Sequence, residues 1–147
     1  MTNRAAVKRR IAFDIAPVAL AAVDLGVEGR TAERIPVEYG TPPAEATESC
    51  MYLPLNSQAT VIDILRGIII QSGNDASKAI AEHMAGSEEG FAKLMNAEAQ
   101  RLGMTHTHFM NATGLPDPEH KSSARDLAIL ARAIIHDSVD YYPIYAE

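Results

Sequence analysis

A serine and an asparagine flank a glycine where two apolar segments of this chain meet. Ser72 and Asn74 stand in the stretch QSGNDA, between VIDILRGIII and ASKAIAEHMAG. A hydroxyl both donates and accepts hydrogen bonds, and an amide offers donors and an acceptor, so these side chains could form part of a site. Serine and asparagine are also common in caps and turns. The alternative is that Asn74 caps one helix while Ser72 bonds a free carbonyl of the other.

A second group of residues with chemical potential lies further along the chain. His106 and His108 alternate on an extended piece and would face the same side, so with His120 they could form a metal site. No carboxylate or cysteine has compelling ligand spacing, and we favour surface histidines. The single cysteine, Cys50, cannot form an internal disulfide and is expected to be a small apolar residue.

The composition restricts the class of protein. The chain has 147 residues, of which 47% are hydrophobic and 22% charged, which is typical of one globular domain or part of one. The formal net charge is −6 and no dense stripe of Lys and Arg is present, so nucleic acid is not an expected partner. No apolar run is long enough to span a bilayer.

The polar junction should be positioned by helices. Residues 24–50 show no sustained period and are rich in Gly, Pro, Thr and Glu, which favours loop. Thr60, with Asp63 three residues later, predicts the start of a helix that runs to about Gln71. This helix is apolar on most sides, so it should be central and buried.

Three further helices are predicted from cap residues. One starts near Asn74 or Asp75 and ends at Gly86, and the next starts after Ser87 and ends at Gly103. Ser123 and Asp126 predict the start of the last, LAILARAII. Residues 104–122 should form a turn-rich loop laid over the four helices.

Beyond the short motif, the surrounding sequence resembles a known family. RGIIIQSGNDA, GSEEGFAKLMN, THFMNATGL and SSARDLAILARAII look closely like the low-molecular-mass penicillin-binding proteins that are serine-type D-alanyl-D-alanine carboxypeptidases. The resemblance covers about residues 50–147. It implies a mainly α chain: the helical subdomain of a β-lactamase/transpeptidase-like α+β fold, with most of the sheet missing. Residues 1–49 are interpreted as an irregular leader without family resemblance.

The resemblance also implies a chemistry. In this family a serine attacks the terminal D-Ala-D-Ala bond of a peptidoglycan stem peptide and forms an acyl-serine. By position, Ser72 and Asn74 are the family's Ser-x-Asn motif, with Ser72 as proton relay and Asn74 as substrate and lysine anchor. Stem peptides and β-lactams are the implied ligands, no cofactor or metal is needed, and the cell envelope is the implied location.

Two motifs of the family are absent from the sequence. No Ser-x-x-Lys occurs, since Ser49 and Ser57 are followed three residues later by Tyr52 and Thr60, and Lys-Thr-Gly is absent too. The chain is therefore expected to be inactive alone. A shifted reading frame or a truncated gene is our hypothesis for the difference. A non-catalytic remnant or helical interaction module is the alternative, and within enzymes a D-Ala-D-Ala endopeptidase.

The N-terminus allows two interpretations. MTNRAAVKRR followed by IAFDIAPVALAAV has the basic start and apolar stretch of a signal peptide, whereas Asp14 within that stretch argues against one. A short leader is the favoured alternative. The sequence leaves export and membrane association open.

Overall fold

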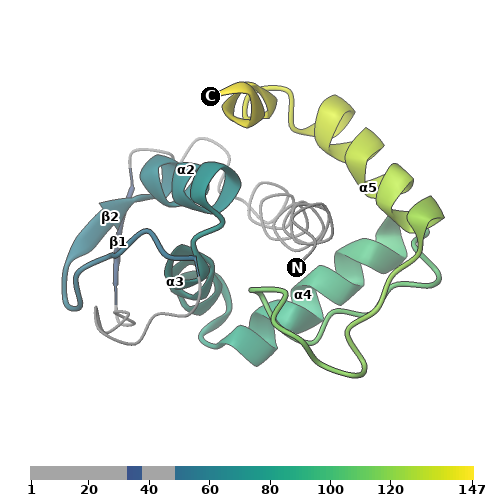
Figure 1. Ribbon diagram of the computed structural model, residues 1–147, viewed down its shortest axis with the longest axis horizontal. Helices are drawn as coiled ribbons and strands as arrows, with labels where there is room; N and C mark the ends of the chain where they lie inside the picture. Colours follow the sequence, from purple (N-terminus) through teal and green to yellow (C-terminus); the bar gives the residue numbers. More distant parts are fainter. Residues whose placement is uncertain (1–32, 38–48) are drawn as a thin grey trace, which may run out of the picture.

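Helices dominate the computed structural model, which describes residues 33–37 and 49–147 (Figure 1). Within these residues a two-stranded sheet precedes the helices, and the mainly helical class predicted from the sequence is confirmed. The elements are β1 (Arg34–Pro36), β2 (Gln58–Thr60), α2 (Val61–Gln71), α3 (Asn74–Ala85), α4 (Glu88–Arg101), α5 (Ala124–Asp137) and the 3-10 helix η2 (Tyr142–Ala146).

The strand β1 corrects the expectation that residues 24–50 are loop. It pairs antiparallel with β2, with Ile35 opposite Ala59. Ile35 and Val37 are buried, while Arg34 is exposed and its guanidinium donates a hydrogen bond to the Gln58 carbonyl at 3.1 Å. Three residues are too few for a visible alternating pattern, and the strand depends on a partner far along the chain.

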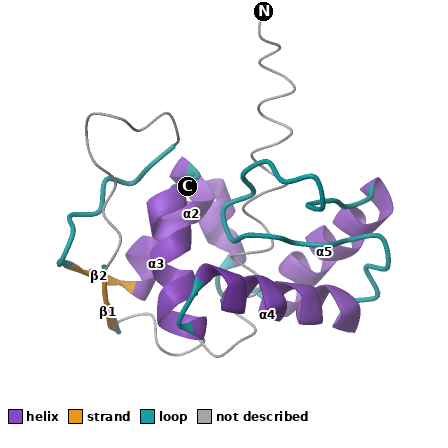
Figure 2. Ribbon diagram, turned by 90° about the horizontal axis from the view of Figure 1, so that it is seen from below, coloured by secondary structure: helices purple, strands orange, loops and turns teal. Residues whose placement is uncertain are grey.

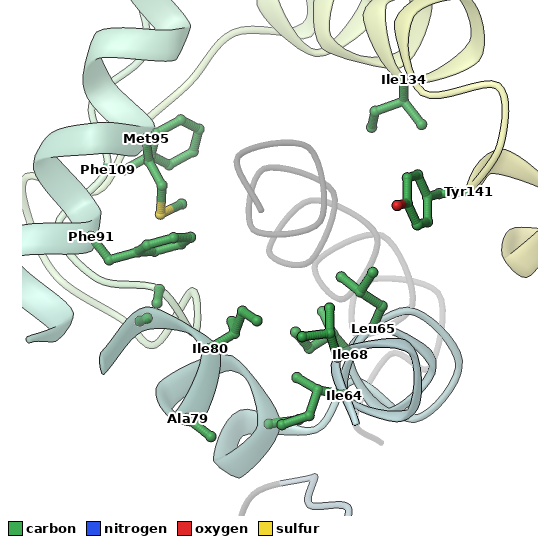
Figure 3. Close-up of a cluster of buried hydrophobic side chains, with 14 of the residues drawn as sticks. Ile64, Leu65, Ile68, Ala79, Ile80, Phe91, Met95, Phe109, Ile134 and Tyr141 are labelled. Carbon is green, nitrogen blue, oxygen red and sulfur yellow. The ribbon is translucent and has the colours of Figure 1, made fainter. Parts of the chain in front are cut away.

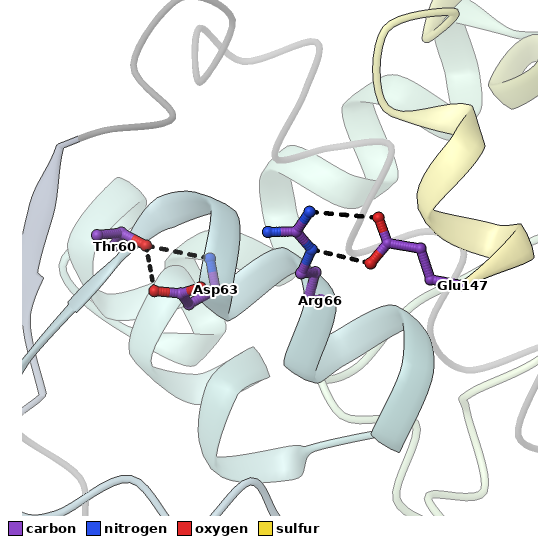
Figure 4. A network of polar contacts seen from close by, with 4 residues as sticks. All are labelled: Thr60, Asp63, Arg66 and Glu147. Atoms are coloured by element: carbon purple, nitrogen blue, oxygen red, sulfur yellow. Dashed lines mark hydrogen bonds and ion pairs between the residues drawn. The ribbon is translucent and has the colours of Figure 1, made fainter.

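The helix α2 begins where its cap residues predict. The Thr60 hydroxyl accepts a hydrogen bond from the Asp63 N–H at 3.3 Å and lies 2.5 Å from the Asp63 carboxylate (Figure 4). α2 contacts β2, α3 and η2, so its predicted central position is confirmed. Its buried residues are Val61, Ile64, Leu65, Gly67 and Ile68.

An ion pair ties α2 to the C-terminal end of the chain. The Arg66 guanidinium donates to both carboxylate oxygens of Glu147, at 2.9 and 3.2 Å (Figure 4). Both side chains are exposed, so this bidentate pair contributes only modestly to the contact between η2 and α2.

The core lies between the helices (Figure 3). Gly86, in the left-handed conformation with φ 73°, ends α3, and the Ser87 hydroxyl accepts from the Gly90 N–H to begin α4, as predicted. This tight connection lets α3 and α4 pack on each other. Core side chains from several elements include Ile64, Leu65, Ile68, Ile80, Phe91, Met95, Phe109, Ile134 and Tyr141.

The side chain of Asn96 fastens the segment between α4 and α5 to α4. The Asn96 amide donates to the Phe109 carbonyl at 2.7 Å and accepts from the Phe109 N–H at 2.8 Å, as a neighbouring strand would. Figure 2 shows this loop running between α4 and α5. None of the helices in the described part of the chain has both the length and the apolar character needed to cross a membrane.

Candidate active site

Ser72 closes α2 in a backbone conformation that serine seldom adopts. It is the C-cap residue, with φ 57° and ψ 38°, in the left-handed region. Its N–H bonds the Ile68 carbonyl at 3.1 Å, and the next N–H, of Gly73, bonds the Gly67 carbonyl at 3.0 Å. A left-handed residue other than glycine costs on the order of 1 kcal/mol or more, and such residues cluster at functional sites.

The cap interpretation of Asn74 is wrong. Asn74 is the first residue of α3, Gly73 is the N-cap, and no side-chain hydrogen bond is made at the cap. At the end of α2, the Gly67 and Ile68 carbonyls are bonded by backbone N–H groups. Ser72 and Asn74 are both half-buried at adjoining helix ends. Their catalytic roles stay predictions.

The junction is held by an irregular segment, residues 49–53, which we call the strap. The Asn74 N–H bonds the Ser49 carbonyl at 2.9 Å, and the Ser49 hydroxyl donates to the Gln71 carbonyl. The Asp75 carboxylate accepts from the N–H groups of Met51 and Leu53. The strap therefore contacts the last residue of α2 and the first two of α3.

Sequence reasoning missed Asp75, which was considered only as a cap. Its side chain is 3% exposed, and its hydrogen bonds reach a segment more than twenty positions earlier in the chain. The sequence does place a carboxylate next to Asn74 in the first turn of a helix. Negative charge is favoured there in most helices, so this position alone does not indicate a functional residue.

The three histidines considered as metal ligands contact other residues of the loop between α4 and α5. The His106 ring contacts the Thr105 hydroxyl, and His108 lies 3.3 Å from the Glu119 carbonyl. His120 packs edge-on against Phe109, with ring centroids 5.6 Å apart. Within residues 33–37 and 49–147, no group of three potential ligands is placed to hold a metal ion.

A second buried carboxylate, Asp126, lies at the start of α5. Its carboxylate accepts hydrogen bonds from the His106 N–H at 2.8 Å and from the Thr107 hydroxyl at 2.7 Å. The backbone N–H of Asp126 donates to the Ser123 hydroxyl, which caps the helix. Burial raises the pKa of Asp126, but these hydrogen bonds outweigh it and hold that pKa below its usual value. Asp126 thus joins the loop to α5, as Asp75 joins the strap to α3.

Family membership follows from comparison with known proteins. The sequence model of the D-alanyl-D-alanine carboxypeptidases matches residues 19–147. The chain belongs to this family. The matched range includes residues 19–49, which lie in the segment interpreted as a leader.

Individual relatives agree in sequence and in fold. The Escherichia coli D-alanyl-D-alanine carboxypeptidase DacC is 47% identical over 105 residues, which are 71% of this chain and 26% of DacC. DacA from Haemophilus influenzae is 46% identical over 67% of this chain and 25% of its own length. The chain therefore spans about a quarter of the length of these curated relatives.

A solved structure extends the likeness to three dimensions. The penicillin binding protein 5 of Haemophilus influenzae superposes with a TM-score of 0.81 and 35% identity, over 91% of this chain and 40% of that structure. The helices described above are therefore the counterpart of part of a penicillin-binding-protein fold.

Proposed function

We propose that the α2–α3 junction is the Ser-x-Asn element of a D-alanyl-D-alanine carboxypeptidase active site. The observation that carries the proposal is Ser72 itself, which keeps a left-handed backbone at the junction although glycine would adopt it without strain. Family membership and the names of the relatives support the same assignment.

The proposed roles follow from the chemistry of the two side chains. Ser72 passes the proton of the attacking nucleophile toward the leaving amine, because a hydroxyl accepts one proton while giving up another. Asn74 donates its amide N–H to the substrate backbone and accepts from a lysine ammonium. The reaction is hydrolysis of the terminal D-Ala-D-Ala bond of a peptidoglycan stem peptide in the cell envelope, and β-lactams bind the same site.

The chain alone is proposed to be inactive. An acyl-enzyme needs an activated nucleophile, and a serine hydroxyl is activated by an adjacent base. The sequence has no Ser-x-x-Lys to supply that pair and no Lys-Thr-Gly. Ser72 and Asn74 can assist a nucleophile but cannot replace it.

A chimera tests the two roles directly. Residues 50–147 replace the corresponding residues of Escherichia coli DacC, and release of D-alanine from a pentapeptide is measured. We expect an active chimera in which Ser72→Ala lowers kcat about 100-fold or more, the usual contribution of a positioned proton-transfer group. Asn74→Ala should raise KM and lower kcat.

The matched control is Ser123→Ala, which removes a helix cap at α5 and leaves the junction untouched. It should change the thermal midpoint of the chimera but keep kcat within about twofold, since a cap contributes to stability only. An active chimera whose kcat is the same with serine or alanine at residue 72 would refute the proposed relay.

A further inference from the structure

Asp75 uses all of its carboxylate to bind backbone. One oxygen, Oδ1, accepts from the Met51 N–H at 2.8 Å and from its neighbouring Ala76 N–H at 3.0 Å. The other, Oδ2, accepts from the Leu53 N–H at 2.9 Å. These donors are two residues apart on the strap, so a single carboxylate spans them. The side chain is 3% exposed, which makes each bond costly to lose.

The strap in turn fixes the backbone of the Ser-x-Asn element. The Ser49 carbonyl accepts from the Asn74 N–H at 2.9 Å, and the Ser49 hydroxyl bonds the last carbonyl of α2, that of Gln71. A Cβ added at Gly73 would lie 3.2 Å from both the Met51 nitrogen and Asp75 Oδ1. The strap and the Asp75 carboxylate therefore press closely against the residue between Ser72 and Asn74.

A carboxylate suits this position better than an amide does. Asparagine has one acceptor oxygen, so its NH₂ group would face the N–H of Met51 or Leu53, donor against donor. The negative charge also lies in the first turn of α3, where the helix dipole favours it. Since the strap donors come from a segment without regular structure, nothing comparable to a sheet ladder replaces the lost bond.

We propose that Asp75 is a positioning residue for the Ser-x-Asn element. By binding Met51 and Leu53 it holds the strap, and the strap holds Ser72 in its left-handed conformation and Asn74 at the first position of α3. This inference rests on the proposed function for its catalytic meaning, but the structural coupling itself is tested without activity.

The test compares Asp75→Asn with Asp126→Asn in the full 147-residue chain by NMR. Asp126 is the matched control, because it is equally buried and also accepts from a backbone N–H and a hydroxyl, but at α5. We expect Asp75→Asn to move the ¹³C shifts of Ser72 away from left-handed values and to speed amide exchange of Asn74 at least tenfold. Asp126→Asn should speed exchange at His106 and leave Ser72 and Asn74 unchanged.

Unchanged Ser72 shifts and Asn74 exchange in Asp75→Asn would overturn the proposal. Equal changes in both variants would also overturn it, because the effect would then be general destabilisation. If Asp75→Asn does not fold, the wild-type chain decides. The amides of Met51 and Leu53 should exchange at least 100-fold more slowly than in an unstructured peptide, and unprotected amides there would refute the coupling.

The outcome separates this inference from the proposed function. If Ser72→Ala leaves the kcat of the chimera unchanged, the relay role of Ser72 is refuted. The coupling of Asp75 to the strap can still be measured by amide exchange in that case. Conversely, if Asp75→Asn leaves the Ser72 shifts and the Asn74 amide exchange unchanged, the positioning role of Asp75 is refuted. The kinetic effect of Ser72→Ala in the chimera does not depend on that result.

Discussion

Met51 lies across Gly67, in the space where a larger residue in α2 would place its Cβ. A Cβ built at Gly67 would stand 3.2 Å from Met51 Cγ and would overlap the sulfur. Glycine in a helix interior costs about 1 kcal/mol relative to alanine. The helix tolerates this cost at a position where the strap must approach its backbone.

Gly67→Ala should gain little of the stability that alanine, the better helix former, normally adds. The new Cβ forces the flexible Met51 side chain to move, which offsets a gain of about 1 kcal/mol in helix propensity. Urea denaturation followed by circular dichroism measures the free energy of unfolding. In a Met51→Ala background the same change should stabilise the chain by about 1 kcal/mol, and an equal gain in the wild-type background would contradict the contact.

Ser72 should be replaceable by glycine more easily than by alanine. Its left-handed backbone suits glycine, whereas alanine keeps the steric conflict of a Cβ. We expect Ser72→Gly to be more stable than Ser72→Ala by about 1 kcal/mol in urea denaturation. Equal stabilities would mean that the left-handed conformation is not held in solution. Neither variant should support the relay in the chimera.

Asp126 should make stability depend on acid pH. Its folded pKa lies below its usual value, so the unfolded chain binds the proton first as pH falls. The contribution is complete above the unfolded pKa of about 3.9 and is lost as pH falls through the lower folded value. Urea midpoints measured from pH 7 to pH 2.5 should decline less steeply in Asp126→Asn. Identical slopes in the two proteins would contradict the hydrogen-bonded carboxylate.

His120 should titrate below an ordinary histidine. Burial lowers its pKa most strongly, nearby Asp117 raises it, and His108 lowers it further. Because the unfolded imidazole binds its proton near pH 6.5, the free energy of unfolding should fall as pH drops below about 6.5. NMR titration of the His120 ring gives the pKa directly. A midpoint at or above 6.5 would contradict its packing against Phe109.

Local signals predicted the helices well. Thr60, Gly86, Ser87 and Ser123 are cap residues whose effect depends on the next few positions, and each lies where the sequence indicated. The strand β1 was missed because its stability comes from pairing with β2 and from burial of Ile35, both of which depend on distant residues.

The candidate site was predictable only in part. Ser72 and Asn74 were singled out by their sequence context and by family resemblance, since Ser-x-Asn alone is too short to be specific. Asp75 and the strap could not be found in this way. The residues around Met51 and Leu53 contain no pattern that predicts hydrogen bonds from their N–H groups to the carboxylate of Asp75.

The proposed absence of a nucleophile is tested by the intact mass of the purified, folded chain after incubation with a penicillin. Haemophilus influenzae penicillin binding protein 5 serves as the positive control, and amide exchange shows that the chain is folded. We expect an unchanged mass, because the sequence contains Ser72 and Asn74 but no Ser-x-x-Lys motif to supply a nucleophile. A mass increase equal to the penicillin, mapped to a serine of this chain, would contradict it.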